Sequence, residues 1–429
     1  MKVYFIGIGG IGISSLVQYY LSIKDQALGS DLVKTEITDL LESKGAKIYI
    51  GQNRNNIDSS IDLVIYTPAV EKDNPELLRA KELGINCMSY PEALGKLTKQ
   101  YFTIAVSGSH GKSTTVAMIS NILIEAGLDP TVIIGTKLKE FNDSNFRKGE
   151  SKYLLIEADE YKASFLNYHP DIIVYTNIES EHLDFYGSLD NILKTAKQYI
   201  NNLKENGILI YNSDDNNLNQ IIKNISFKKI PYSLSKTYEI ENVLQLPGKH
   251  LISDALGALM VGRILGINDK VSLGALSQYQ GAWRRFEIKE MNRFVMVSDY
   301  AHHPTEIKAT LISAREKWPD KEIWVVYQPH QYQRTYYLFD DLVDCFSNID
   351  VNKIVLLPIY DVAGREEKNI KEKVSSKKLY EQILNNRENV FYCDSLDSVK
   401  DFIDKNIKGE EVIFIMGAGD IYDLTKKLD

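Results

Sequence analysis

The stretch Val106-Ser-Gly-Ser-His-Gly-Lys-Ser-Thr-Thr115 constrains the fold of this chain more than any other. It follows an aromatic and β-branched run, residues 101–106, that predicts a buried strand, and it precedes residues 116–127, whose apolar positions recur at helical spacing. A glycine loop between a strand and a helix lets backbone N–H groups surround a phosphate, and the helix start adds partial positive charge. Lys112 adds a full positive charge, and the Ser113 hydroxyl can hold Mg²⁺. This order predicts a phosphate-binding loop.

The loop departs from the strict Walker A pattern, which would have a glycine in place of Val106. It is therefore a shortened form, and a structural turn that binds nothing is the alternative interpretation. The strand–helix context favours phosphate binding. We expect the nucleotide contacts to come from Gly108, Ser109, His110, Gly111, Lys112, Ser113 and Thr114.

Composition limits the class of protein. A length of 429 residues predicts about three domains, and 44% hydrophobic with 25% charged residues is typical of soluble globular proteins. The net charge of −8 argues against nucleic acid as the main partner. Three widely spaced cysteines and the lack of a long apolar run predict a cytoplasmic protein with no membrane partner. Small molecules are the expected partners, and the protein is expected to be a monomer or a homodimer.

The first predicted domain, residues 1–97, begins with a strand over residues 2–6 that runs into Gly7-Ile-Gly-Gly-Ile-Gly12. Asp31 follows at the distance expected of a carboxylate that binds a ribose, and Thr67 lies at the carboxyl end of another buried strand. These features predict a Rossmann-like unit that binds a diphosphate. The glycines alone do not distinguish NAD from a UDP-sugar, so an NAD-dependent oxidoreductase is an open alternative.

The second predicted domain, residues 98–286, places carboxylates after strands. Residues 153–160 form an apolar strand ending in Glu157, Asp159 and Glu160, where a nucleotide-dependent enzyme would hold Mg²⁺. An acidic strand end that merely faces water is the alternative. His182 follows the next strand among Glu179, Glu181 and Asp184, which makes it a candidate ligand.

The third predicted domain, residues 287–429, alternates strands with helices, which predicts a parallel sheet covered on both faces. Three histidines, His302, His303 and His330, lie just past strand ends. Their spacing is not the helical i, i+4 pattern of a metal site. A pocket for a substrate anion or amine is the favoured interpretation.

Together, the motifs occur in the order found in the Mur ligases, and the chain resembles that family over nearly its whole length. The resemblance is carried by Gly7–Gly12, Gly108–Thr114, Glu157–Glu160, Thr176–Asp184, Asp299–Glu306, Gln328–His330 and Met416–Ile421. It implies three α/β domains: a Rossmann-like N-terminal domain, a central P-loop-type ATPase domain and a Rossmann-like C-terminal domain. It also implies a ligase that uses ATP and Mg²⁺ to join L-alanine to the carboxylate of UDP-N-acetylmuramate through an acyl phosphate, in peptidoglycan precursor synthesis.

The resemblance implies roles for individual residues. Catalysis would involve Lys112, Glu157, His182 and Arg285, and the metal would be held by Ser113, Glu157 and His182. Besides the phosphate loop, ATP would contact His250, Arg285 and Asp299. The UDP-sugar and the amino acid would contact Gly9, Gly10, Ile11, Gly12, Asp31, Thr67, Tyr300, His302, His330 and Arg334.

Four places depart from the family pattern. Residues 212–247 form a shorter segment than usual, and residues 142–149 match the corresponding loop poorly. Leu251 stands where an asparagine is usual near the adenine, and Gln331 stands where an arginine usually follows Gln-Pro-His. These departures leave open a ligase for another amino acid or a peptide, as in the murein tripeptide ligases, or a catalytically impaired nucleotide-binding homologue.

Overall fold

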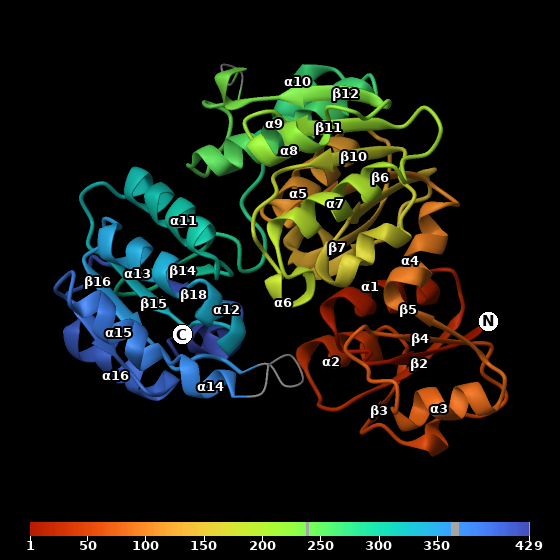
Figure 1. Cartoon of the computed structure of the whole chain (residues 1–429), viewed down its shortest axis with the longest axis horizontal. Coiled ribbons are helices and arrows are strands. Elements are labelled where there is room, and N and C mark those ends of the chain that lie inside the picture. The colour runs from red at the N-terminus through yellow and green to blue at the C-terminus, as the bar shows by residue number, and fades with distance from the viewer. Residues whose placement is uncertain (237–239, 362–368, 429) are drawn as a thin grey trace. The chain divides into compact units, whose positions relative to one another are not determined.

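The computed structural model describes residues 1–236, 240–361 and 369–428. Over these residues the chain is mixed α/β with three sheets, which confirms the predicted fold class (Figure 1). It divides into two compact units, residues 1–243 with 253–277, and residues 244–252 with 278–429. The domain boundaries predicted at residues 97 and 286 stay predictions. Among the described residues, no helix has the length and apolar character needed to cross a membrane.

The N-terminal sheet is parallel, with the order β3-β2-β1-β4-β5. Its strands are β1 (Lys2–Ile6), β2 (Gln26–Asp31), β3 (Lys47–Ile50), β4 (Leu63–Tyr66) and β5 (Asn86–Ser89). The helices between and after them are α1 (Ile11–Ser22), α2 (Glu36–Ser43), α3 (Pro75–Glu82) and α4 (Tyr90–Thr98). The chain leaves β1 toward one edge and returns to β4 on the other side, so β1 and β4 flank a topological switch point, where ligands of open α/β sheets bind.

The central sheet has the order β12-β11-β10-β6-β9-β7-β8. Its strands are β6 (Phe102–Ser107), β7 (Thr131–Leu138), β8 (Ser144–Arg147), β9 (Tyr153–Glu157), β10 (Ile172–Tyr175), β11 (Ile208–Asn212) and β12 (Lys228–Tyr232). Its helices are α5 (Lys112–Glu125), α6 (Leu183–Tyr186), α7 (Leu189–Ile200) and α8 (Asn216–Ile221), and the chain continues through α9 (Lys249–Ile264) and α10 (Asp269–Ser277). Because β6 lies between β10 and β9 and runs parallel to both, the loops after these three strands meet at one edge.

The third sheet has the order β13-β14-β18-β15-β16-β17. Its strands are β13 (Glu287–Glu290), β14 (Val295–Asp299), β15 (Ile323–Tyr327), β16 (Lys353–Leu356), β17 (Val390–Tyr392) and β18 (Val412–Met416). Its helices are α11 (Pro304–Lys317), α12 (Tyr332–Tyr337), α13 (Phe339–Asn348), α14 (Ile370–Lys373), α15 (Ser376–Leu384), α16 (Leu396–Asn406) and α17 (Asp423–Lys427).

The prediction of a wholly parallel third sheet was wrong at one edge, where β13 pairs antiparallel with β14. Only a short turn joins these two strands, and a turn of that length permits an antiparallel hairpin but not the crossover that a parallel pair requires. The central sheet likewise carries the antiparallel strand β8 beside β7, within the segment that matches the family poorly.

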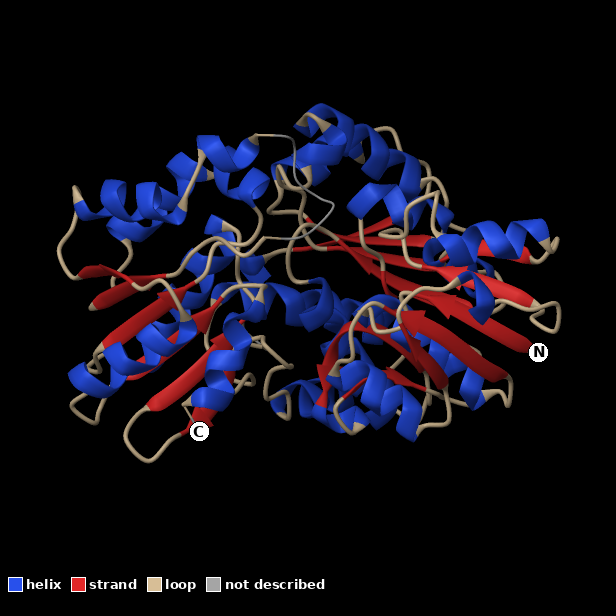
Figure 2. Ribbon diagram, turned by 90° about the horizontal axis from the view of Figure 1, so that it is seen from below, coloured by secondary structure: helices blue, strands red, loops and turns tan. Residues whose placement is uncertain are grey.

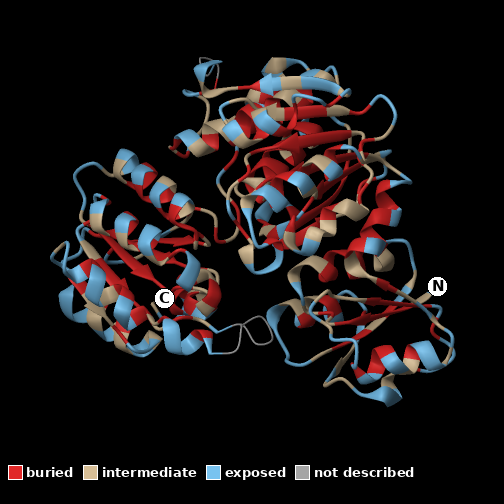
Figure 3. Cartoon of the chain, in the orientation of Figure 1, coloured by how far each residue is buried: buried red, intermediate tan, exposed pale blue. Residues whose placement is uncertain are grey.

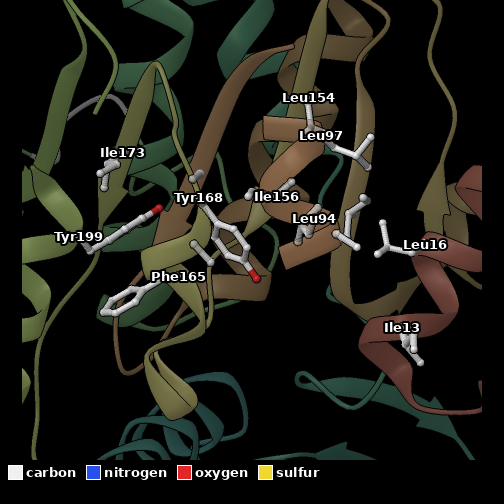
Figure 4. Packing of buried hydrophobic residues seen from close by; sticks show 14 of the residues in the cluster. Ile13, Leu16, Leu94, Leu97, Leu154, Ile156, Phe165, Tyr168, Ile173 and Tyr199 are labelled. Atoms are coloured by element: carbon white, nitrogen blue, oxygen red, sulfur yellow. The ribbon is translucent and has the colours of Figure 1, made fainter. Parts of the chain in front are cut away.

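The cores follow from the apolar strands. Strands lie between layers of helices (Figure 2), and the sheets are largely buried while the helices expose their outer faces (Figure 3). In the first unit one hydrophobic cluster joins the N-terminal and central sheets. Figure 4 shows Leu16 of α1, Leu94 of α4 and Ile156 of β9 in this cluster. The first two sheets therefore share a continuous core.

Candidate active site

The phosphate loop connects β6 to α5 and depends on two glycines. Gly108 has a φ of 139°, and a Cβ there would lie 2.1 Å from Thr176 Oγ1. Gly111 has a φ of 81°, and a Cβ there would lie 2.3 Å from Asp254 Oδ1. At both positions φ is positive, which residues with a side chain disfavour, and a Cβ would also lie too close to a neighbouring atom. Glycine is therefore the residue that fits. These are the two glycines that the sequence predicted would shape the loop.

The loop that follows β10 holds the phosphate loop in place. The Asn177 amide oxygen accepts a hydrogen bond from the backbone N–H of His110 at 2.9 Å, and the Thr176 hydroxyl donates to the His110 carbonyl at 2.6 Å. The Ser109 hydroxyl accepts from the N–H of Glu179 at 2.8 Å. Two neighbouring strand ends thus fix the loop before any ligand binds, which is the preorganisation that an anion site requires.

Lys112, the first residue of α5, points back over the loop. Its ammonium donates to the carbonyl oxygens of Gly108 at 2.6 Å and Ser109 at 3.2 Å, and it lies 3.0 Å from Glu160 Oε2. The Lys112 and Glu160 side chains are 13% and 6% exposed, so this is a buried ion pair. Burial alone lowers the pKa of Lys112, but the carboxylates of Glu160, Asp159 and Glu157 outweigh it and raise that pKa. Lys112 is therefore a permanent cation.

The oxygen atoms predicted to bind a metal lie in the same loops as Lys112. The Ser113 hydroxyl donates to Glu157 Oε2 at 2.8 Å, and the same oxygen accepts the backbone N–H of Gly135 at 2.8 Å. Two of the three predicted metal ligands are thus in direct contact. The third, His182, lies with Asp159 and Glu160, and one ligand atom from each of these three residues can lie within 4.8 Å of the others. His182 has a φ of 53°, a strained conformation of the kind that recurs at functional sites.

The glycine loop of the N-terminal sheet is shaped by β2. The backbone N–H groups of Gly7 and Ile8 donate to the Ser30 carbonyl at 2.9 and 3.0 Å, and the N–H of Gly9 donates to Asp31 Oδ2 at 2.8 Å. Asp31, half-buried at the end of β2, therefore holds the glycine loop through a backbone N–H, a role that the sequence did not indicate. Its predicted contact with a ribose stays a prediction, as do the substrate contacts of Gly10, Ile11, Gly12 and Thr67.

In the second unit, the loops after β14 and β15 form a row of rings. The Arg285 guanidinium lies 4.9 Å from the centre of the Tyr300 ring, and Arg284 lies 5.0 Å from it. The Tyr300 and His302 rings are 5.5 Å apart, and His302 and His330 are 6.1 Å apart. The structure thus brings together the residues predicted to hold the amino acid.

The protonation of this row follows from its partners. The Arg334 guanidinium, which can only donate, lies 3.1 Å from His330 Nδ1, so that nitrogen is an acceptor and the ring proton is on Nε2. His302 Nδ1 lies 3.1 Å from the Tyr300 carbonyl, which can only accept, so Nδ1 carries the proton there. With one proton on each ring, Nε2 is therefore an acceptor in His302 and a donor in His330, which suits an amine and a carboxylate respectively.

Asp299, at the end of β14, is buried. Its carboxylate accepts the backbone N–H groups of Phe286 and Ala301, each at 2.8 Å. Burial raises the pKa of Asp299 to about 6, although Arg285 and the two hydrogen bonds oppose that rise. The structure shows Asp299 fixing the chain around Arg285, and its predicted contact with the ATP ribose stays a prediction.

The two remaining departures lie on described residues. Burial lowers the pKa of His250 to about 4, so this imidazole is neutral at physiological pH, and the neighbouring Leu251 is 5% exposed. Gln331 has a φ of 72°, and its N–H donates to the Tyr360 carbonyl at 2.9 Å, which sets the start of α12. The shortened segment, residues 212–247, lies partly outside the described residues.

Two residues of these sites have contacts that the sequence did not predict. Glu160 is the partner of Lys112, and its signal was the last residue of Glu-Ala-Asp-Glu. Arg284, buried beside Arg285, donates to the Gly419 carbonyl at 3.1 Å and links the strand-end loops of β14 and β18. Its sequence signal, a second arginine before Arg285, does not indicate which of the two reaches a ligand.

Family models match all three parts of the chain. The Mur ligase family catalytic domain matches residues 2–102, the Mur ligase middle domain residues 106–246, and the Mur ligase glutamate ligase domain residues 284–419. The chain belongs to the Mur ligase family. The resemblance predicted from the motifs is thereby confirmed.

The similarity to individual Mur ligases extends over the full length. The UDP-N-acetylmuramate–L-alanine ligase of Clostridium tetani is 39% identical over 98% of this chain and 96% of its own length. That of Clostridium botulinum strain Hall is 38% identical over 98% and 95%. The crystal structure of UDP-N-acetylmuramate–alanine ligase from Thermotoga maritima, 25% identical, superposes with a TM-score of 0.81 over 100% of this chain and 98% of that one. A murein peptide ligase from Psychrobacter arcticus, 21% identical with a TM-score of 0.74, shares the fold.

Proposed function

We propose that this Mur ligase joins L-alanine to the carboxylate of UDP-N-acetylmuramate at the expense of ATP, in peptidoglycan precursor synthesis. The observation that carries the proposal is the buried Lys112 at the start of α5, held over the phosphate loop beside Ser113 and Glu157. The full-length similarity to UDP-N-acetylmuramate–L-alanine ligases supports the choice of substrates. We further propose that the enzyme works in the cytoplasm as a monomer or homodimer.

The reaction begins with activation of a carboxylate, which is a poor electrophile. Transfer of the γ-phosphoryl group of ATP to that carboxylate gives an acyl phosphate and ADP. Attack by the amine of L-alanine on the acyl carbon then forms the amide and releases phosphate and a proton. Backbone N–H groups at the start of α5 bind the ATP phosphates, and Lys112 neutralises the charge that develops during the transfer. To do so, Lys112 exchanges carbonyl and Glu160 contacts for phosphate oxygens.

Mg²⁺ fits the donors present. Ser113 Oγ and Glu157 Oε2 are hard oxygen ligands 2.8 Å apart at the end of the phosphate loop, where a nucleotide-bound Mg²⁺ takes protein ligands. Bound there, the ion would withdraw charge from the phosphates of ATP. A second group of ligand atoms comes from Asp159, Glu160 and His182, in the loops that follow β9 and β10. We propose that Ser113, Glu157 and His182 hold the metal.

The second unit supplies the acceptor site in this proposal. Tyr300, His302, His330 and Arg334 form a row that offers both donors and acceptors to an amino acid. Arg334 supplies positive charge for the carboxylate. His250, Arg285 and Asp299 are proposed to face ATP. Transfer between substrates held by different parts of the chain requires closure of the enzyme around them.

A coupled phosphate-release assay with ATP, Mg²⁺, UDP-N-acetylmuramate and each amino acid in turn tests the function. We expect turnover with L-alanine. Turnover only with another amino acid or with a tripeptide would transfer the chain to another branch of the family. Titration of the enzyme with UDP-N-acetylmuramate and, separately, with NADH tests the glycine loop. Binding of NADH without binding of the UDP-sugar would refute the assignment of the N-terminal site.

A further inference from the structure

A buried amide network crosses from the N-terminal sheet's first helix to the central sheet. Gln18 on α1 and Asn145 on β8, 127 residues apart in the chain, are each 3% exposed. Gln18 Nε2 donates to Asn145 Oδ1 at 2.8 Å. Buried amides of this kind are costly unless every donor and acceptor is used.

The direction of every bond in this network is set from one end. The Lys44 ammonium, which can only donate, contacts Gln18 Oε1, and the Ser144 hydroxyl donates to the same oxygen at 2.8 Å. Gln18 therefore turns its nitrogen toward Asn145. Asn145 must accept on its oxygen, which leaves its nitrogen facing α1.

That nitrogen reaches the first turn of α1, directly after the glycine loop. Asn145 Nδ2 donates to the Ile11 carbonyl and to the Ser14 hydroxyl, the latter at 3.1 Å. Ser14 in turn donates to the Ile11 carbonyl at 2.9 Å. The N–H groups of this turn are the ones that would bind a diphosphate, because a helix N-terminus carries orphan donors and partial positive charge.

The elements that carry this network, α1 and β8, also pack together in the hydrophobic core of the first unit. Leu16 and Ile13 of α1 pack in the same cluster as Ile133 of β7 and Phe146 of β8, and Figure 4 shows Ile13 and Leu16 within it. These apolar contacts hold α1 against the central sheet. Directional hydrogen bonds from Asn145 specify where the first turn points.

We propose that Asn145 and Gln18 are positioning residues of the UDP-sugar site. They fix the diphosphate-binding turn of α1 to the sheet that carries the phosphate loop. The UDP-sugar site is therefore composite, since a strand of the central sheet orients a loop of the N-terminal sheet. This inference rests on the proposed function, because it assigns the α1 turn to the diphosphate of UDP-N-acetylmuramate.

The test is a double-mutant cycle read by calorimetric titration of the full-length enzyme with UDP-N-acetylmuramate and, separately, with ATP. Asn145→Ala and Gln18→Ala should each raise the Kd for the UDP-sugar roughly tenfold, as expected for loss of buried hydrogen bonds. The Kd for ATP should stay unchanged. The double variant should also raise the Kd for the UDP-sugar by no more than about tenfold, because both residues act through one network.

Asn202→Ala is the matched control. Asn202 donates an amide hydrogen bond to the Leu166 carbonyl at 2.7 Å within the central domain, away from α1, so its loss should leave both Kd values unchanged. If Asn145→Ala does not fold, Ser144→Ala replaces it, because it removes one bond to Gln18 and one from the Phe146 N–H but keeps both amides, and it should raise the UDP-sugar Kd roughly threefold.

Three outcomes overturn the inference. The first is a wild-type Kd for the UDP-sugar in Asn145→Ala, or in Ser144→Ala where that variant replaces it. The second is a hundredfold, multiplicative effect in the double variant. The third is an equal loss of ATP binding, which would indicate general destabilisation. Failure of the wild-type enzyme to bind UDP-N-acetylmuramate would instead overturn the proposed function, and the inference with it.

Discussion

Replacement of Lys112 by methionine tests the role of its positive charge in phosphoryl transfer. Methionine keeps a similar length but removes the ammonium that contacts Gly108, Ser109 and Glu160. Loss of one preorganised group that stabilises a developing charge costs about 3 kcal/mol or more, so the rate of phosphate release should fall by at least about 150-fold. The coupled phosphate-release assay with saturating substrates measures this fall.

The same change affects stability, because it leaves Glu160 buried without its cation. Breaking a buried ion pair from one side costs about 3–5 kcal/mol, and both side chains here are more than four-fifths buried. Burial also raises the pKa of Glu160. In the variant, the folded state would then keep a proton at pH values where the unfolded chain has released it. The free energy of unfolding should therefore fall as the pH rises between the two pKa values.

The double variant Lys112→Met with Glu160→Gln provides the control. It removes the uncompensated charge, so urea unfolding at pH 7.5 should show most of the lost stability restored while phosphate release stays at least about 150-fold below that of the wild type. Undiminished turnover in Lys112→Met would remove the phosphate loop from the mechanism. A Lys112→Met protein as stable as the wild type at neutral pH would refute the interpretation of the buried pair.

Three further predictions concern other sites. Because burial raises the pKa of Asp299 from 3.8 to about 6, the free energy of unfolding should fall by about 3 kcal/mol as the pH rises through that window, and Asp299→Asn should remove most of this slope in urea titrations; an unchanged slope would contradict the assignment. Gln331→Arg should lower the KM for L-alanine by about tenfold without changing that for ATP, whereas Gln331→Gly should not, since only arginine adds a charge-assisted pair; an unmoved KM would place Gln331 outside the carboxylate pocket. Ser113→Ala should raise the Mg²⁺ concentration for half-maximal activity roughly tenfold, and an unchanged Mg²⁺ requirement would exclude Ser113 as a ligand.

Local features were predictable from the sequence because their causes are local. An apolar run followed by a glycine loop and a helix identifies a phosphate loop wherever it occurs, and Gly108 and Gly111 adopt the conformations that such a loop requires. The order of these motifs along the chain was enough to predict three α/β parts and the family. Strand ends that carry carboxylates were likewise visible, since β9 and β10 are short apolar runs with polar residues directly after them.

Partners across the fold were decided by the tertiary structure. Glu160 became the counter-ion of Lys112 because β9 lies beside β6, an arrangement that depends on strand order and not on either segment alone. The direction of β13 followed from a short turn, whereas Asn145 met Gln18 only because β8 packs on α1, far away in the chain. A sequence pattern specifies which face of an element is apolar, but which polar group completes a buried hydrogen bond is specified only when two such faces are in contact.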